Sequence, residues 1–283
     1  MQDYRIKKIL VPLDFSALSL NALYHAERIA GPSGASITLL HVVTPIVGAV
    51  GTSGMMAVAM RMERQLQTES TKRLQKIAQV AMKRSAVEIE TKVVLGPVGS
   101  MIRKSAERTG ANIIIMGTHG ASGFFENMLG SNTYHVTTLS DLPVMCVHRR
   151  PIASGYCNVV FPVRENTQVM EKLPHALTFA KMFKARVHVV GHARTNRNVD
   201  TAKIRRLCRV LKEQFSKHGI VTKTAFTPGD QFADAIVRYA QVYFSSLVVI
   251  LQDHDFKLVE LFGGSFSKTM LHKALSPVLT IPR

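Results

Sequence analysis

Glycine and hydroxyl residues gather near the middle of the chain in a pattern that suits phosphate binding. Gly117 and Gly120 have no Cβ, so the backbone can turn sharply there and approach a ligand closely. Gly130 and Ser131 stand where a helix is predicted to begin, and the N–H groups and dipole of a helix N-terminus favour an anion. Ser131 and Thr133 would add hydroxyl donors. This segment therefore predicts a site for a phosphate group.

A carboxylate lies at the end of the first predicted strand. Asp14 could accept a hydrogen bond from a ribose or a base, and Ser16 can cap the helix that follows. The second strand ends at His41–Val43. Ligands of parallel α/β sheets bind beyond the carboxyl ends of the strands, so these tips and the glycine segment should converge on one site. The alternative is that the glycines only mark loops and Ser131 only caps a helix.

Other chemical motifs are missing from the sequence. There is no GxxxxGK[ST], and Gly117, Gly120 and Gly123 are three residues apart, so no GxGxxG follows a strand. No Ser/His/Asp or Cys/His arrangement can be argued from spacing. The run Asp253-His254-Asp255 has metal-ligand types, but consecutive side chains point in different directions. No metal site is therefore predicted.

Strands and helices alternate along the chain, which predicts an α/β fold with doubly wound parallel sheets and right-handed crossovers. Several of the strands are continuous Val/Ile/Leu runs, as expected when both faces of a sheet are covered. The strands predicted in the first half are Ile6–Leu13, Ser36–Val43, Val87–Leu95, Asn112–Gly117 and Pro143–His148. Its predicted helices are Leu18–Ala30, Ala59–Lys83, Gly99–Thr109 and Ser131–Leu139. The strands predicted in the second half are Asn158–Val163, Arg186–Gly191, Val221–Phe226, Ser246–Leu251 and Pro277–Ile281.

The chain contains two diverged copies of one unit. Ile9–Leu13 recurs as Val159–Val163, and later segments recur at a shorter offset. The first copy therefore carries extra residues, Thr44–Met60, which are rich in Gly, Ala and Met. We interpret them as a loop leading into a core helix, or alternatively as a flap over the site or a partner surface. Two domains are predicted, residues 1–150 and 151–283.

The first copy resembles the universal stress protein family. The run Gly117-x2-Gly120-x9-Gly130-Ser131 is similar to that family's ATP-binding signature, and Ile9–Asp14 and Leu142–Val144 are similar to its opening and closing segments. The resemblance covers residues 5–148 and, more weakly, 157–283. It implies two tandem five-stranded parallel-sheet domains of the adenine nucleotide alpha-hydrolase-like kind. The two domains would pack as a pseudo-twofold pair through their last strands, with a homodimer as a further option.

The resemblance also implies a ligand, which is ATP, ADP or AMP with or without Mg2+. Asp14 and the main chain of Val42 would hold the adenosine, with Met116 and Gly117 alongside. Asn132 stands where the family more often has Val or Thr. The complete set of predicted nucleotide-binding residues is Pro12, Asp14, Val42, Met116, Gly117, Gly120, Gly130, Ser131, Asn132 and Thr133.

The second copy has lost most of this motif. Arg164 stands at the position of Asp14, and Gln252–Asp255 replaces the first pair of glycines, while Gly264-Ser265 remains. An arginine offers only donors, and the two aspartates would repel phosphates. The sequence therefore predicts one nucleotide per chain, bound in the first domain.

Composition limits the class of protein. Of 283 residues, 46% are hydrophobic and 19% are charged, which excludes a disordered polymer. No apolar stretch reaches the roughly 18 residues of a spanning helix, and the opening residues lack a signal-peptide pattern. Three cysteines without CxxC spacing favour a reducing compartment, so a cytoplasmic protein is predicted.

The charge leaves more than one function open. The chain has 36 Lys and Arg against 19 Asp and Glu, a net charge of +17 that is spread over both halves. The leading prediction is a stress-response binding and signalling module, because no P-loop lysine or placed base supports fast hydrolysis. A slow ATPase or nucleotide-dependent phosphotransferase is one alternative. The other is nucleic-acid binding, although no RNP, KH or helix-turn-helix signature is present. The basic helix Lys203–Lys217 is interpreted as a solvated face or a polyanion patch.

Overall fold

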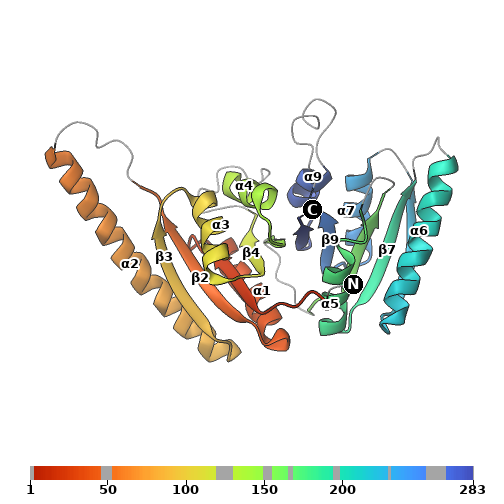
Figure 1. Cartoon of the computed structure of the whole chain (residues 1–283), viewed down its shortest axis with the longest axis horizontal. Helices are drawn as coiled ribbons and strands as arrows, with labels where there is room; N and C mark the ends of the chain where they lie inside the picture. The colour runs from red at the N-terminus through yellow and green to blue at the C-terminus, as the bar shows by residue number, and fades with distance from the viewer. Residues whose placement is uncertain are drawn as a thin grey trace. The chain divides into compact units, whose positions relative to one another are not determined.

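The chain folds into two compact units, shown in Figure 1. Of the residues that the structure describes, the amino-terminal unit holds 6–118 and 130–140, and the carboxy-terminal unit holds 3–5 and 141–282. The structure is a computed structural model, and it describes residues 3–45, 53–118, 130–148, 155–164, 168–193, 198–228, 231–252 and 266–282.

The amino-terminal unit is built on four parallel strands in the order β3-β2-β1-β4. Ile9 of β1 pairs with Ile37 of β2 on one side and with Ile113 of β4 on the other. The chain thus moves outward from β1 to β3 and then returns to β4, which creates a switch in strand order beside β1. The elements are β1 (Lys8–Pro12), α1 (Ala17–Ser33), β2 (Ser36–Val43), α2 (Ser53–Ser85), β3 (Ile89–Leu95), α3 (Val98–Thr109), β4 (Ile113–Gly117) and α4 (Ser131–Leu139).

Helices cover both faces of this sheet. Ile9, Leu10 and Val11 are consecutive in β1 and all 0% exposed, although neighbouring side chains of a strand point to opposite faces. The continuous apolar run in the sequence therefore reflects a strand whose two faces are both covered, as in a parallel sheet. Helix α1 begins where Ser16 accepts a 3.2 Å hydrogen bond from the Ser19 amide, and it ends at Gly34 in the left-handed region.

Helix α2 is longer than the sequence predicts. Its expected start at Ala59 is wrong, because the helix already begins at Ser53, and residues 46–52 lie outside the described structure. Its 33 residues span about 50 Å, whereas the seven residues of β3 span about 23 Å. The first turns of α2 therefore extend past the sheet (Figure 1), and Met55 and Met60 are 56% and 49% exposed rather than buried in the core.

The carboxy-terminal unit contains six strands in the order β5-β10-β9-β6-β7-β8. All neighbours are parallel except β5 and β10, which pair antiparallel with Cys146 opposite Val278. The expected pairing of the last strands of the two copies is thus confirmed, and so is the α/β class. The elements are β5 (Val144–Val147), β6 (Asn158–Val163), α5 (Leu173–Phe183), β7 (Arg186–Ala193), α6 (Asn198–Lys217), β8 (Thr222–Pro228), α7 (Phe232–Val242), β9 (Leu247–Leu251), α9 (Phe266–Lys273) and β10 (Val278–Ile281).

Within the described ranges, no helix is both long enough and apolar enough to cross the hydrocarbon core of a membrane.

Candidate functional site

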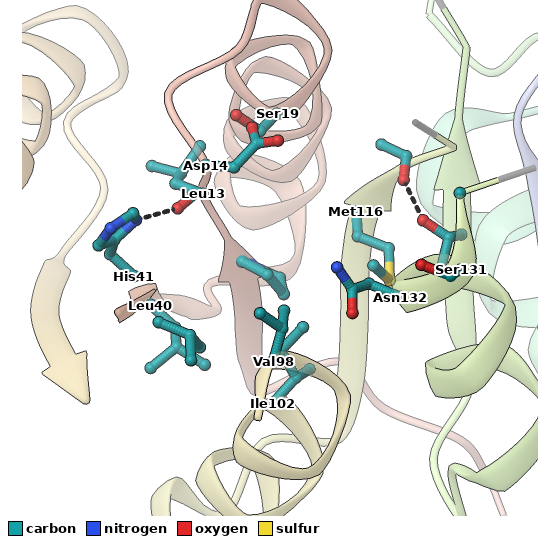
Figure 2. A pocket seen from close by; sticks show the side chains of 15 residues that line it. Leu13, Asp14, Ser19, Leu40, His41, Val98, Ile102, Met116, Ser131 and Asn132 are labelled. Carbon is teal, nitrogen blue, oxygen red and sulfur yellow. Dashed lines mark hydrogen bonds between the residues drawn. The ribbon is translucent and has the colours of Figure 1, made fainter. Parts of the chain in front are cut away.

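A pocket of about 170 Å³ lies in the amino-terminal unit, where β1 and β4 part at their carboxyl ends (Figure 2). Most of the predicted binding residues surround it, and Gly120 lies outside the described residues. The predicted residues that line the pocket are Pro12, Asp14, Val42, Met116, Gly117, Gly130, Ser131, Asn132 and Thr133.

The tip of β1 holds the carboxylate of the site. Asp14 is half-buried, and its Oδ1 atom accepts a 3.0 Å hydrogen bond from the backbone amide of Ser16. The Leu13 amide donates to the Leu40 carbonyl at 2.8 Å, which fixes the tip of β1 against β2. These local bonds explain why the sequence folds into a turn that presents a carboxylate. In Figure 2, Leu13 and Asp14 lie on one side of the pocket and Met116 and Asn132 on the other.

The beginning of α4 forms the opposite side. The N-cap residue is Gly130, which has no side chain to cap the first N–H groups of the helix. Its own amide donates to the Thr118 carbonyl at 2.9 Å, so the start of α4 is attached to the end of β4. Ser131 and Asn132 are exposed beside the pocket. A helix start of this kind can bind an anion through its amides and dipole.

Two predicted residues act differently from the expectation. The hydroxyl of Thr133 donates its hydrogen to the Gly117 carbonyl at 2.9 Å, so it positions α4 and cannot also donate to a ligand. Gly117 is outside the left-handed region, and an added Cβ would lie 3.1 Å from the Cβ of Leu18 on α1. Glycine is needed at this position for packing against α1, and not for a sharp turn toward a ligand.

Six lining residues are not in the predicted set of binding residues, although Leu13 and His41 lie at the strand ends that were expected to converge, and four of the six form an apolar wall. Leu40 and Ile102 are almost completely buried, and Val98 lies one turn before Ile102 on α3. The signal available for Val98 and Ile102 was the position of α3 directly after a strand. The six residues are Leu13, Ser19, Leu40, His41, Val98 and Ile102.

His41 belongs to a stack of rings at the edge of the pocket. Its Nδ1 atom lies 2.7 Å from the Leu13 carbonyl, as Figure 2 shows, and a carbonyl only accepts, so Nδ1 carries a proton. The ring of Phe15 is 4.4 Å from that of His41, and the Arg73 guanidinium is 4.2 Å from the centre of the Phe15 ring. Phe15 has φ 66°, a strained value for a residue with a side chain. This strained residue lies at the β1 tip, directly after Asp14.

The chemistry of the pocket follows from these groups. Among the described lining residues, Asp14 is the one carboxylate, and no lysine or arginine is present. The pocket offers an acceptor at one side, an apolar wall, and amide donors at the start of α4. It suits a molecule with a hydroxyl or amine, a flat apolar body and an anionic group.

Comparisons with known proteins identify a family for the first half of the chain. The sequence profile of the universal stress protein family matches residues 5–148. Universal stress protein MJ0531 of Methanocaldococcus jannaschii is 33% identical over 147 residues, which are 50% of this chain and 82% of that protein. Universal stress protein YxiE of Bacillus subtilis is 32% identical over 144 residues, 50% of this chain and 97% of that protein.

The whole chain also has a counterpart among solved structures. The crystal structure of a universal stress protein from Archaeoglobus fulgidus matches with a TM-score of 0.76 at 19% identity, covering 99% of this chain and 97% of that one. At this identity the match concerns the fold alone, and it extends the fold assignment to both halves. Together with the family match to the first half, it shows that the chain belongs to the universal stress protein family.

Proposed function

We propose that this protein is a cytoplasmic stress-response module that binds ATP in the pocket of its amino-terminal unit. The observation that supports this proposal best is the convergence of nine residues, chosen from a nucleotide-binding signature, on a single pocket. Residues far apart in the sequence, such as Asp14 and Asn132, meet there. Occupancy of the pocket, rather than turnover, would carry the signal.

The proposed fit assigns one part of the nucleotide to each side of the pocket. Asp14 would accept a hydrogen bond from the ribose or the base. The apolar wall that includes Leu40 and Ile102 would contact adenine. The amides at the start of α4, with the Ser131 hydroxyl, would bind the phosphates. ADP and AMP would share the first two contacts.

The same residues favour binding over catalysis. Rapid phosphoryl transfer needs a cation near the transferred group and a group that orients the attacking water. The described lining residues supply neither a lysine nor an arginine. Over the described residues, no group of three His, Cys, Asp or Glu side chains is arranged to hold a metal ion.

Calorimetric titration with ATP tests the proposal. We expect saturation near one equivalent, and we expect Asp14→Ala to remove most of the binding. Asp141→Ala is the matched control, because Asp141 is exposed and remote from the lining residues. Retained affinity in Asp14→Ala, or purified protein that binds no nucleotide, would contradict the proposal. A timed hydrolysis assay separates binding from a slow ATPase.

Polyanion binding is a second candidate function, favoured by one face of α6. Lys203, Arg206, Arg209 and Lys212 are exposed, and no ion pair to them is found among the described residues. The apolar face of the helix, which includes Phe215, is buried, so it cannot enter a bilayer. A row of unpaired cations on a rigid helix suits the phosphates of a nucleic acid.

A further inference from the structure

Strands β6 and β9 of the second repeat stop pairing before their carboxyl ends, at the same place in the sheet as β1 and β4 beside the pocket of the first repeat. Strand registers establish the correspondence, because Ile9 pairs with Ile113 in the first sheet and Val159 pairs with Leu247 in the second. The neighbouring strands β2 and β7 also follow one offset. At the strand ends, the counterparts of Asp14 and Val42 are Arg164 and His192.

The helices correspond in the same way. Ile102 of α3 and Ile236 of α7 are equivalent buried positions, as are Val136 of α4 and Met270 of α9. The pocket residues Val98 and Asn132 therefore have as their counterparts Phe232 and Phe266.

These four counterparts stack on one another. The Arg164 guanidinium lies 5.2 Å from the centre of the Phe266 ring. The rings of Phe266 and Phe232 are 4.6 Å apart and nearly parallel, at 17°. The ring of Phe232 is in turn 4.7 Å from that of His192, which is 6% exposed. A continuous column of planar groups thus runs from the end of β6 to the end of β7.

Part of the column is exposed to solvent and does not lie in the deep core. Phe232 and Phe266 are only half-buried, unlike Phe161 and Phe215, which are 0% exposed. Aromatic and cation–π contacts stabilise such a column without further partners. Planar groups occupy the space in which the first repeat would receive a flat ligand.

A buried lysine lies between β6 and β9 where the two strands stop pairing. Lys172 is 2% exposed, and its Nζ atom donates to the carbonyls of Pro162 at 2.6 Å and Val249 at 3.0 Å. These carbonyls belong to β6 and β9, just beyond the last paired residues of the two strands. Burial, with a contribution from the charge of Arg164, lowers the pKa of Lys172 well below its usual value. The equivalent residue of the first repeat is Ala22, which has no side-chain amine to reach these carbonyls.

We infer that the second repeat fills its own ligand crevice with the stack Arg164–Phe266–Phe232–His192, and that it therefore excludes a nucleotide. The inference rests on the proposed function only for the identity of the excluded ligand. In the second repeat, side chains of the protein itself permanently fill the place where the first repeat would bind a ligand.

Histidine NMR tests the stack without any nucleotide. In protein labelled at histidine, stacking on Phe232 should shift the ring protons of His192 upfield by the ring current. Phe232→Leu should move them back toward the position of an exposed histidine. Phe244→Leu makes the same change at a side chain that is 86% exposed and should leave them unchanged. His192 signals that are unaffected by Phe232→Leu would overturn the inference.

Nucleotide titration then separates this inference from the proposed function. Wild-type protein should bind about one equivalent of ATP, and Asp14→Ala should lose most of that binding. Two equivalents bound by wild-type protein would overturn the inference and leave nucleotide binding standing. Absence of binding in wild type, with the shift of His192 intact, would reject the proposed function and support the filled crevice.

Discussion

The hydroxyl of Thr133 donates a 2.9 Å hydrogen bond to the carbonyl oxygen of Gly117. Thr133 is 3% exposed, so the bond is formed out of water. It connects the end of β4 directly to the first turn of α4, the two segments between which a phosphate would bind. The position of the helix start therefore depends on a side chain whose hydroxyl proton is already used within the protein.

Thr133→Val should weaken ATP binding by up to about fivefold, because the lost hydrogen bond is worth about 1 kcal/mol and leaves α4 free to shift. Calorimetry measures the change in dissociation constant. Thr138→Val is the control, since that hydroxyl bonds to Tyr134 within its own helix at 2.9 Å. Equal affinities for the two variants would show that the Thr133 hydrogen bond does not position the start of α4 for ATP binding.

Gly117→Ala should lower the free energy of unfolding by roughly 1–3 kcal/mol, because the new Cβ would lie 3.1 Å from the Leu18 Cβ. Gly31→Ala is a matched control. Gly31 lies in α1 directly before Pro32, and apart from its neighbours in the sequence an added Cβ there meets nothing within 4 Å, so this variant should lose less stability than Gly117→Ala. Urea denaturation of both variants measures the difference. A Gly117→Ala protein as stable as wild type would contradict the packing argument.

Acid should destabilise the protein through His175. Burial lowers the pKa of His175 to about 4, against 6.5 in an unfolded chain. As the pH falls from 6.5 toward 4, the unfolded chain takes up a proton that the native chain does not bind. The free energy of unfolding should therefore fall by about 3 kcal/mol over this window and should not depend on His175 above it. Urea titrations at pH 7 and pH 4.5 measure the fall.

His175→Phe should remove this part of the pH dependence, while keeping a ring beside Tyr4, which lies 4.1 Å from the His175 ring. His218→Phe, at an exposed histidine, serves as the control and should leave the pH dependence unchanged. An identical acid profile in both variants would exclude His175 as the cause.

The cationic face of α6 should bind duplex DNA with a strong dependence on salt. Replacing four of its cations with glutamine should lower the slope of log affinity against log salt by about 3 to 4, because each phosphate contact contributes about 0.9. Fluorescence anisotropy with a duplex of about 30 base pairs, recorded at several salt concentrations, measures this slope. The α6 variant changes Lys203, Arg206, Arg209 and Lys212, and a control variant on the corresponding helix α2 changes Arg61, Arg64, Lys72 and Lys76, which are also exposed. Equal losses in both variants would indicate a diffuse charge effect instead of an α6 site.

The fold was largely predictable because its strands have strong local signals. The predicted bounds Ser36–Val43, Asn158–Val163 and Ser131–Leu139 agree with β2, β6 and α4. Each begins or ends beside a clear change from apolar to turn-forming residues. The start of α2 was missed because its Met- and Ala-rich turns have no core to face, so no apolar periodicity marks them.

The pocket was predictable only in part. Rules about strand ends lead to Asp14 and Met116, but Val98 and Ile102 reach the site because α3 packs over β2 and β1. The stacked column of the second repeat was not predicted. Its four members come from different elements, and only the folded sheet brings Arg164 beside Phe266.

The ladder between β5 and β10 lies within a single polypeptide. In an assembly of two identical subunits, one gene specifies both partners, so a substitution that fills one site fills the other as well. Two repeats joined in one chain are free of that constraint. Phe232 and Phe266 could arise in the second repeat while Val98 and Asn132 were kept in the first. Covalent fusion thereby permits a division of labour, in which one repeat retains the pocket and the other is free to lose it while still pairing through β10.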